Sequence, residues 1–463
     1  CESLPQNLKV FHTPVAKFLV RRKTHHKEEY LMAIIPQLRL FNWHDVENLG
    51  DLKRLKMVLD NLPDEELVQV LEEERGSRGR NDYPVRAVWN SIIAGIVFQH
   101  LGIEHLRREL KRNAQLRYVC GLSGTPSSAA YTRFFRKLYS KNTYLEKIFI
   151  ELVAKVEEQI EDFGTVLAID GKPIQSFAKG KSKSSAKDGR RDFDANWGKH
   201  EYKGVNKDGS TWIKTETWFG YKLHLIVDAK YELPVDFKVT KASEAELPQA
   251  LKLLKSVKKN HPNLLKRTDY LLGDRGYDAT ELIRESWDKY GIKPIIDIRN
   301  MWKDGEKTRL LKGYQNIGYN YRGTVFCYCP KTSKEKEMVY GGFEKDRETL
   351  KYRCPAIHYG ISCCGKDICP VKSGIRIPLE TDRRLFTPVA RSSYKWEAEY
   401  NKRTAIERVN SRIDSLYGFE NHFIRGLSKM NARCGLALCV MLSMALGRIK
   451  TKNGSMRSLV QPA

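Results

Sequence analysis

Short apolar runs that end in an aspartate give this chain its clearest pattern. Residues 166–169 are apolar, two of them β-branched, and lead into Asp170 and a glycine, which predicts a buried strand with a carboxylate at its end. Residues 270–273 repeat the pattern and stop at Asp274. Because an isolated buried carboxylate is costly, two such strand ends indicate a shared positive ligand, and a divalent metal is the first candidate.

Apolar residues at helical spacing predict a series of helices before the first of these strands. The expected helices begin at Asp64 and Pro84 and then cover residues 103–111, 125–138 and 145–161. The helix over 125–138 places Arg133, Arg136 and Lys137 outside an aromatic stripe. A helix, a turn and a basic helix are compatible with a helix-turn-helix reader of duplex DNA, and equally with a packed bundle that has a solvated basic face.

Downstream, the period of the pattern switches between two residues and about 3.6. Strands are expected over residues 219–228, 235–240, 270–273 and 293–298, and helices over 244–258, 279–290, from Trp396 through Leu416, and over 437–446. Antiparallel strands followed by alternating strands and helices imply a mixed sheet with helices packed on it. Asp228 also ends an apolar run, but the neighbouring Lys230 favours a turn, and His224 is expected to be a core histidine.

The charge of the chain favours a polyanionic partner. Lys and Arg number 81 against 56 Asp and Glu, and the net charge of +25 is spread along the chain. This favours nucleic acid ahead of an anionic membrane surface. Residues 179–192 carry six basic residues, Arg190 and Arg191 among them, with no apolar run. Such a loop is able to order on a phosphate backbone, and a solvated loop without a role is the alternative.

Neither a secretory signal nor a membrane span is predicted. No segment reaches the roughly 20 uninterrupted apolar residues that a spanning helix needs. Residues 435–447 come closest, and the glycines and serine within them indicate a core helix. The chain begins at Cys1 and not at a methionine, which is compatible with a missing natural start.

A cluster of cysteines marks residues 301–390, which have poor helical periodicity. The cluster comprises Cys327, Cys329, Cys354, Cys363, Cys364 and Cys369. Tetrahedral zinc needs four soft ligands, so a structural zinc is the first interpretation. Its ligands would come from Cys327, Cys329 or Cys354, joined by two of Cys363, Cys364 and Cys369. Reduced, unliganded cysteines in a β-rich insertion are the alternative. Cys434 and Cys439 lie in the apolar C-terminal helix and are expected in the core.

The third acid of a phosphoryl-transfer site is predicted on a helix. Two cations roughly 4 Å apart need about three carboxylates from separate elements. Tyr400, Arg403 and Glu407 are spaced three and then four residues apart, so they share one helical face. Arg403 could hold a phosphate by forked contact and Tyr400 could pack on a sugar or base. The plainer alternatives are a surface ion pair of Arg403, and turn caps at Asp170 and Asp274.

At these residues the chain resembles the DDE transposases of bacterial insertion sequences, whose catalytic core has an RNase H-like fold. The resemblance rests on A-I-D-G at Asp170, on G-D-R-G-Y at Asp274 and on the Tyr400, Arg403 and Glu407 spacing, which is similar to the Y-x2-R-x3-E-x6-K signature of one branch. It covers about residues 60–450. The signature lysine would fall on Asp414, which departs from the pattern.

The resemblance implies a function as well as a fold. It implies that Asp170, Asp274 and Glu407 bind two magnesium or manganese ions, which activate a water to nick the element's end. The freed 3′-hydroxyl would then attack target DNA. The implied partners are double-stranded DNA and a second copy of the chain in a homodimer, in the bacterial cytoplasm and away from membranes. A nuclease that does not join strands and a non-catalytic DNA-binding protein are the alternatives.

The resulting architecture is α/β, with an RNase H-like mixed-sheet core, an N-terminal all-helical domain and a Cys-rich insertion. The expected boundaries are a helical DNA-binding region over 1–162, the first part of the core over 163–300, the insertion over 301–392, the second part of the core over 393–450 and a tail over 451–463.

Overall fold

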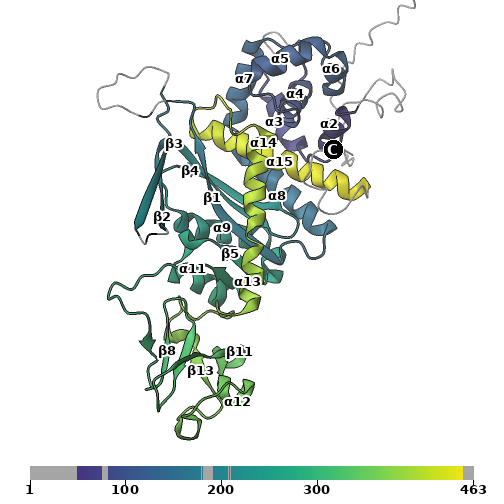
Figure 1. Cartoon of the computed structure of the whole chain (residues 1–463). Coiled ribbons are helices and arrows are strands. Elements are labelled where there is room, and N and C mark those ends of the chain that lie inside the picture. Colours follow the sequence, from purple (N-terminus) through teal and green to yellow (C-terminus); the bar gives the residue numbers. More distant parts are fainter. Residues whose placement is uncertain are drawn as a thin grey trace, which may run out of the picture.

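A six-stranded mixed sheet lies at the centre of the molecule (Figure 1). The computed structural model describes residues 50–75, 82–178, 180, 191–206, 208 and 210–451. The strands are β1 (Val166–Gln175), β2 (Asn196–Val205), β3 (Thr211–Asp228), β4 (Leu233–Lys241), β5 (Tyr270–Gly273) and β6 (Lys293–Ile296). The order is β2-β3-β1-β5-β6, with β4 also paired to β3. β1 is antiparallel to β3 and parallel to β5, which confirms the predicted α/β fold with a mixed sheet.

The long strand β3 has two halves with different surroundings. Its second half is buried between β1 and β4, as its apolar run predicts. Its exposed first half pairs only with β2, and these two segments form a ribbon that the sequence analysis did not predict. Two cross-strand pairs explain the ribbon, because Trp218 lies opposite Gly198 and Trp212 opposite Gly204, so each indole covers a glycine.

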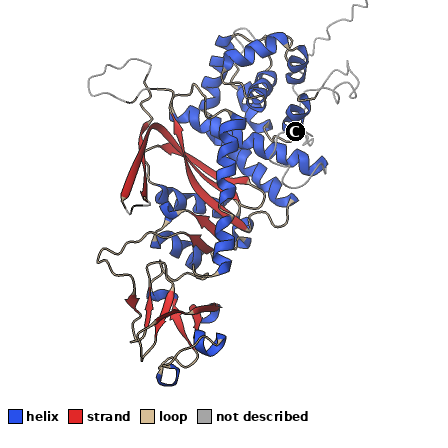
Figure 2. Cartoon of the chain, viewed as in Figure 1, coloured by secondary structure: helices blue, strands red, loops and turns tan. Residues whose placement is uncertain are grey.

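Helices surround this sheet (Figure 2). Those of the core are α9 (Glu246–Asn260), α10 (Pro262–Arg267), α11 (Thr280–Arg284) with the π-helical turn η2 (Glu285–Lys289), α13 (Tyr394–Asn401), α14 (Thr404–Tyr417) and α15 (Leu427–Thr451), and a 3-10 turn, η1 (Arg275–Tyr277), follows β5. α14 contacts β1 and β3, and α9 contacts β1, β3 and β4. Two helices that are distant in sequence therefore meet the strand that carries Asp170.

The prediction of one continuous helix from Trp396 through Leu416 is wrong, because the helix is interrupted. The chain makes two helices, α13 and α14, which run in line and are separated by a tight turn at Lys402 and Arg403 (Figure 1). The Thr404 hydroxyl donates to the carbonyl of Asn401 at 3.0 Å, so the side chain takes an acceptor that the backbone ladder would use. Arg403 is consequently the N-cap of α14 rather than a mid-helix residue.

The N-terminal helices pack together with the sheet in one hydrophobic core. They are α2 (Leu52–Leu59), α3 (Glu65–Glu73), α4 (Val85–Val97), α5 (Ile103–Arg112), α6 (Ala114–Cys120), α7 (Ser128–Tyr139) and α8 (Asn142–Gln159). α15 lies against α8, α2 and β4. By length and composition α15 could cross a membrane, but 89% of its most apolar window is buried inside the protein. The prediction of a core helix is confirmed, and Cys434 and Cys439 are buried in it.

The insertion has a hydrophobic core of its own. It contains β7 (Arg309–Leu310), β8 (Ile317–Tyr319), β9 (Val325–Tyr328), β10 (Glu335–Glu337), β11 (Val339–Glu344), η3 (Lys345–Arg347), β12 (Thr349–Arg353), α12 (Pro355–Tyr359), η4 (Lys366–Ile368), β13 (Gly374–Pro378) and η5 (Leu379–Thr381). The strands form two small antiparallel sheets of four and three strands. This β-rich unit extends from the end of the sheet that β6 occupies (Figure 1).

Candidate active site

Asp170 and Asp274 lie next to each other at the edge where β1 and β5 part. The two strands are parallel, with Ala168 paired to Leu272, and each aspartate stands two residues further on. The prediction that the first strand ends at Asp170 is wrong, because β1 continues to Gln175 along β3. β1 pairs with β5 only as far as Ala168, so at Asp170 the strand is paired with β3 alone. The carboxylate therefore faces space that α14 and the turn after β5 close.

The turn after β5 positions Asp274. Its Oδ1 accepts a hydrogen bond from the Gly276 amide at 2.8 Å, so the carboxylate caps η1. The turn-cap role that the sequence offered as an alternative is thus present in the structure. Capping uses one oxygen, and the second remains available for a ligand.

α14 places an amide on Asp170, and its N-terminal end carries an arginine paired with a further acid. The Asn410 Nδ2 donates to Asp170 Oδ2 at 3.1 Å. Arg403 Nη2 donates to Glu407 Oε1 at 2.8 Å. The Glu407 side chain is 53% exposed, so its carboxylate can change rotamer without disturbing the core.

Burial dominates the electrostatics of Asp170. It raises the pKa of this carboxyl to about 6, opposed by the Gly171 amide that donates to Oδ1 at 2.8 Å. The negative charges of Asp274 and Glu246 raise the pKa further. Asp170 is therefore a carboxylate whose charge is costly until a cation joins it.

Glu246 is a fourth acid at this site that the sequence analysis missed. It is the first residue of α9, where an acidic side chain suits the helix dipole and gives no separate signal. A Cβ on Gly171 would stand 3.0 Å from its Oε1, and a Cβ on Gly276 would stand 2.9 Å from its Oε2. In the sequence, the close approach of the Glu246 carboxylate is reflected only in Gly171 and Gly276, which follow the two aspartates.

Each acid is held by a protein donor. Asn410 holds Asp170, Arg403 holds Glu407 and Lys222 Nζ holds Glu246 Oε1 at 3.0 Å. Within the described ranges, no group of three or more His, Cys, Asp or Glu is already arranged to hold a metal ion. The donor set nevertheless has the right chemistry, because magnesium and manganese prefer carboxylate oxygens. Each carboxylate oxygen has more than one lone pair, so an acid can keep its present donor and still bind an ion.

Tyr400 and Arg403 form a small aromatic and cationic face beside the acids. Tyr400 stacks on Trp396 with 4.7 Å between ring centroids, and the Arg403 guanidinium lies 5.6 Å from the Tyr400 ring. The half-buried Tyr400 ring, which the sequence analysis proposed for packing on DNA, therefore has the Trp396 ring and the Arg403 guanidinium as neighbours.

The position of the signature lysine is filled by an ion pair of reversed polarity. Asp414 Oδ2 accepts from Lys172 Nζ at 2.5 Å, and the side chains are 30% and 10% exposed. Lys172 lies two residues after Asp170 on β1, so both side chains point to the same face of the strand. The signature pattern has a lysine at the position of Asp414 on α14, whereas in this structure the lysine of the pair is Lys172 on β1.

We expect a charge swap at this pair to be tolerated. Asp414→Lys should lower the free energy of unfolding by about 1–3 kcal/mol, because it sets two cations together in a partly buried place. Lys172→Asp combined with Asp414→Lys should recover most of that loss. Urea unfolding of the two single variants and the double variant measures the coupling. Additive losses would show that the pair does not stabilise the fold.

A groove runs along β1 from Lys172, two residues beyond Asp170. Its volume is about 570 Å³, and its lining includes Lys172, Gln175, Phe177 and Phe423. The exposed rings of Phe177 and Phe423 meet edge to face at 5.0 Å, with the Arg425 guanidinium 5.9 Å from the Phe177 ring. Aromatic faces beside basic side chains are typical of sites for nucleic-acid strands.

The structure describes four of the remaining five basic candidates. Arg133 and Arg136 are exposed on α7, whereas Lys137 donates to the carbonyl of Glu74 at 2.7 Å. Arg191 is half-buried, and Arg190 lies outside the described residues.

Two further predictions from the sequence are confirmed. Asp228 is fully buried and accepts from the amides of Gly164, Lys230 and Tyr231 at 2.7, 2.8 and 2.6 Å, so it shapes a turn. His224 is a core histidine whose Nε2 lies 2.9 Å from the Thr240 hydroxyl. Burial and the charge of Lys222 lower the pKa of His224 to about 3, so this imidazole is neutral.

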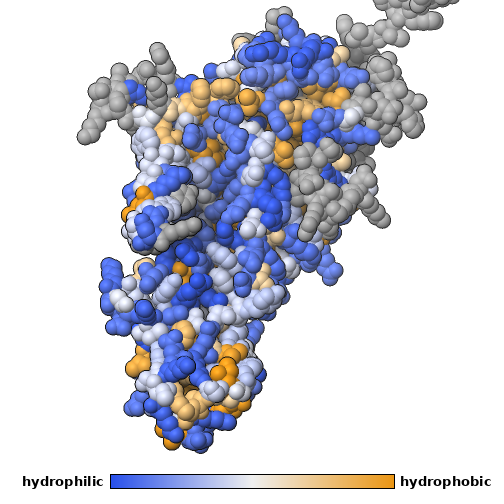
Figure 3. All heavy atoms as spheres, viewed as in Figure 1, coloured by the Kyte–Doolittle hydropathy of each residue, from blue (hydrophilic) through white to orange (hydrophobic). Residues whose placement is uncertain are grey.

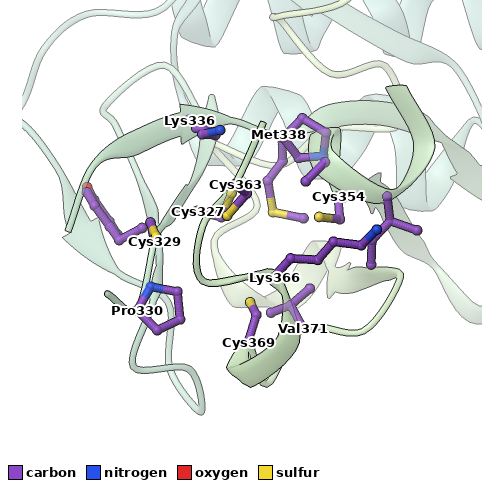
Figure 4. Close-up of a pocket in the computed structure, with 14 residues that line it drawn as sticks. Cys327, Cys329, Pro330, Lys336, Met338, Cys354, Cys363, Lys366, Cys369 and Val371 are labelled. Carbon is purple, nitrogen blue, oxygen red and sulfur yellow. The ribbon is translucent and has the colours of Figure 1, made fainter. Parts of the chain in front are cut away.

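The cysteines of the insertion surround one small cavity (Figure 4). The cavity has a volume of about 20 Å³ and is lined by Cys327, Cys329, Cys354, Cys363 and Cys369. Burial and the neighbouring thiols of Cys354, Cys369 and Cys363 raise the pKa of Cys327 to about 11. Cys364 lies outside this lining, with its Sγ 3.5 Å from that of Cys329. All cysteines in the described part of the chain are free thiols.

Comparisons with known proteins bear on the region that carries the acids. A family model described as a transposase DDE domain matches residues 161–442. The cryo-electron microscopy structure of a piggyBac transposase synaptic complex with hairpin DNA is similar at 9% sequence identity and a TM-score of 0.37, and the alignment covers 89% of this chain and 78% of that chain. No curated protein matches the chain.

Proposed function

The chain belongs to the DDE transposase family, and we propose that it nicks DNA at the ends of an insertion sequence and joins the freed 3′-hydroxyl to target DNA. The adjacent position of Asp170 and Asp274, with Glu407 on the helix that crosses β1, is the observation that carries this proposal. Three acids from three elements are what a clamp on the attacking and leaving oxygens requires.

Asp170, Asp274 and Glu407 would hold two magnesium or manganese ions. When bound, these ions lower the pKa of a water and neutralise charge on the phosphate. Asn410 would orient Asp170 through its hydrogen bond. Release of Glu407 from Arg403 would free both side chains, the acid for an ion and the guanidinium for a phosphate oxygen.

The DNA would lie along the face on which α13 and α14 are seen. Hydrophilic side chains dominate this face (Figure 3). Tyr400 would pack on a sugar or base, and the groove beside Lys172 and Phe177 would take a strand that leaves the acids. Arg133, Arg136, Lys137, Arg190 and Arg191 would contact phosphates further along the duplex. Two element ends must be paired, so we also propose a homodimer on DNA, in the cytoplasm of a bacterium.

Strand cleavage in vitro tests the proposal. The full chain is incubated with magnesium or manganese and duplex DNA that carries its own element's flanks, and joining is followed with pre-nicked ends and a target plasmid. Cleavage and joining should both appear in the parent. Glu407→Gln should abolish them while DNA binding remains. Glu397→Gln, which removes an exposed acid from α13, is the matched control and should leave both reactions intact.

The outcomes separate the alternatives. Cleavage without joining would indicate a nuclease. Retained DNA binding without cleavage in the parent would indicate a non-catalytic DNA-binding protein that keeps the fold as architecture.

We also propose that the cysteine cavity holds one structural zinc ion through Cys327, Cys354, Cys363 and Cys369. Four soft ligands around a cavity of this size suit tetrahedral zinc. The full chain should then contain about one zinc per molecule by elemental analysis. Cys327→Ser with Cys363→Ser should lose the zinc and lower the melting temperature, and Cys364→Ser should keep it. A parent free of zinc after purification in zinc-containing buffer would contradict the proposal.

A further inference from the structure

The carboxylate of Glu246 lies between Gly171 on β1 and Gly276 in the turn after β5, each close in the sequence to one of the two aspartates. Its Oε1 approaches the backbone of Gly171 and its Oε2 approaches that of Gly276, closely enough that a Cβ would stand 3.0 and 2.9 Å away. A Cβ on Gly276 would also stand 2.9 Å from Asp274 Oδ1. One acid from α9 therefore reaches across the gap between the strands.

Lys222 holds this acid in place from the neighbouring strand. Its Nζ lies 3.0 Å from Glu246 Oε1 and 3.3 Å from the Glu244 carbonyl, and the side chain is 10% exposed. The carboxylate is 25% exposed, so it remains accessible to a small ion. Because Lys222 contacts only one of the two oxygens in this arrangement, the Oε2 that faces Gly276 is available as a ligand.

A buried hydroxyl without a partner faces the same acids. Tyr277, in the turn after Asp274, is 1% exposed, and its hydroxyl has no hydrogen-bond partner among the described residues. Burial and then the nearby charges of Glu246, Asp170 and Asp274 raise the pKa of this phenol well above its usual value, so these three carboxylates are the acids in its surroundings. A buried hydroxyl that lies near acids without bonding to them indicates a space for a further polar species, such as a metal-bound water.

The acids around Asp170 outnumber the cations that pair with them, which also favours a bound metal ion. Asp170, Asp274 and Glu246 carry three negative charges, and among the described residues Lys222 makes an ion pair with one of them, Glu246. Acids held this close repel one another unless cations join them.

We infer that Glu246 is a fourth carboxylate of the metal site, and that it shares a magnesium or manganese ion with Asp170 and Asp274. The inference rests on the proposed function and extends it, since the resemblance to transposases implied three acids and no residue of α9. Gly171 and Gly276 are then required because a side chain at either position would push Glu246 out of the site.

Manganese binding in the absence of DNA tests the inference. The full-length parent is titrated with manganese(II), and free manganese is measured by electron paramagnetic resonance. We expect Glu246→Gln to weaken binding about tenfold or more, a change of about 1.4 kcal/mol. Glu244→Gln is the control, because this exposed acid lies two residues before Glu246 and carries the same charge but meets Lys222 only through its backbone carbonyl. Its affinity for manganese should equal that of the parent.

Glu246→Asp and Asp170→Asn make the outcomes decisive. Glu246→Asp should restore part of the affinity if the carboxylate is a ligand. If Asp170→Asn weakens manganese binding and Glu246→Gln does not, with both variants folded by circular dichroism, Glu246 is only a counter-ion of Lys222 and the inference is overturned. If the parent binds no manganese, or Asp170→Asn binds it as the parent does, the proposed metal site fails as a whole.

Discussion

Asp170→Asn should lower the rate of DNA strand cleavage by about 10³-fold, equivalent to about 4 kcal/mol of lost transition-state stabilisation. The substitution keeps the shape of the side chain, and the remaining oxygen can still accept from the Gly171 amide. What is lost is the negative charge that a divalent cation needs. Single-turnover cleavage of end-labelled DNA, with protein in excess, measures the effect without product release.

The same substitution should not weaken the fold. Burial raises the pKa of Asp170 to about 6, so the ionised form that prevails at pH 7 is a cost to the folded state. Asn removes that cost, and the melting temperature should stay equal or rise. Asp269→Asn is the control, since this acid precedes β5, is 63% exposed and lies 3.8 Å from Lys293. Equal cleavage by the Asp170 variant and the parent would remove Asp170 from the chemistry.

The sequence predicted the parts of this site that obey local patterns. Apolar runs placed Asp170 and Asp274 on neighbouring strands of one sheet, and helical spacing placed Glu407 on a helix that crosses it. Alternation alone did not reveal how far β1 continues, because Gly171 and Pro173 are signals of a strand end. Pairing with β3 outweighs those signals, which is a tertiary effect.

The contacts that the sequence could not predict are long-range pairs. Lys172 forms an ion pair with Asp414, 242 positions away, and Lys222 on β3 forms an ion pair with Glu246 on α9. Each of these residues also has an ordinary local explanation, as an exposed strand lysine or an acid in the first turn of a helix. A single sequence therefore contains no reason to prefer the pair, and only the packing of α9 and α14 on the sheet supplies one.

The junction between the core and the insertion depends on one buried carboxylate. The Asp278 side chain is fully buried; its Oδ1 accepts from Arg384 Nε at 2.9 Å, and its Oδ2 accepts from Arg384 Nη2 at 2.6 Å. The Arg299 amide donates to Oδ2 at 2.8 Å. Asp278 follows η1 in the core, whereas Arg384 follows the last strand of the insertion, so this forked contact ties together two segments 106 positions apart.

Arg384→Met should therefore lower the free energy of unfolding by about 3–5 kcal/mol, because it removes the forked partner of a buried carboxylate and leaves it only the more exposed Arg299, whose Nε lies 4.0 Å away. Urea unfolding followed by tryptophan fluorescence measures this loss. Arg376→Met is the control, since Arg376 makes a forked contact of the same kind with Glu344 at 2.7 and 3.0 Å on the surface, where removal should cost less than about 1 kcal/mol. Asp278→Asn should rescue part of the Arg384→Met loss, because it removes the stranded charge. Equal losses in the two arginine variants would mean that the junction is held by its apolar contacts and not by this pair.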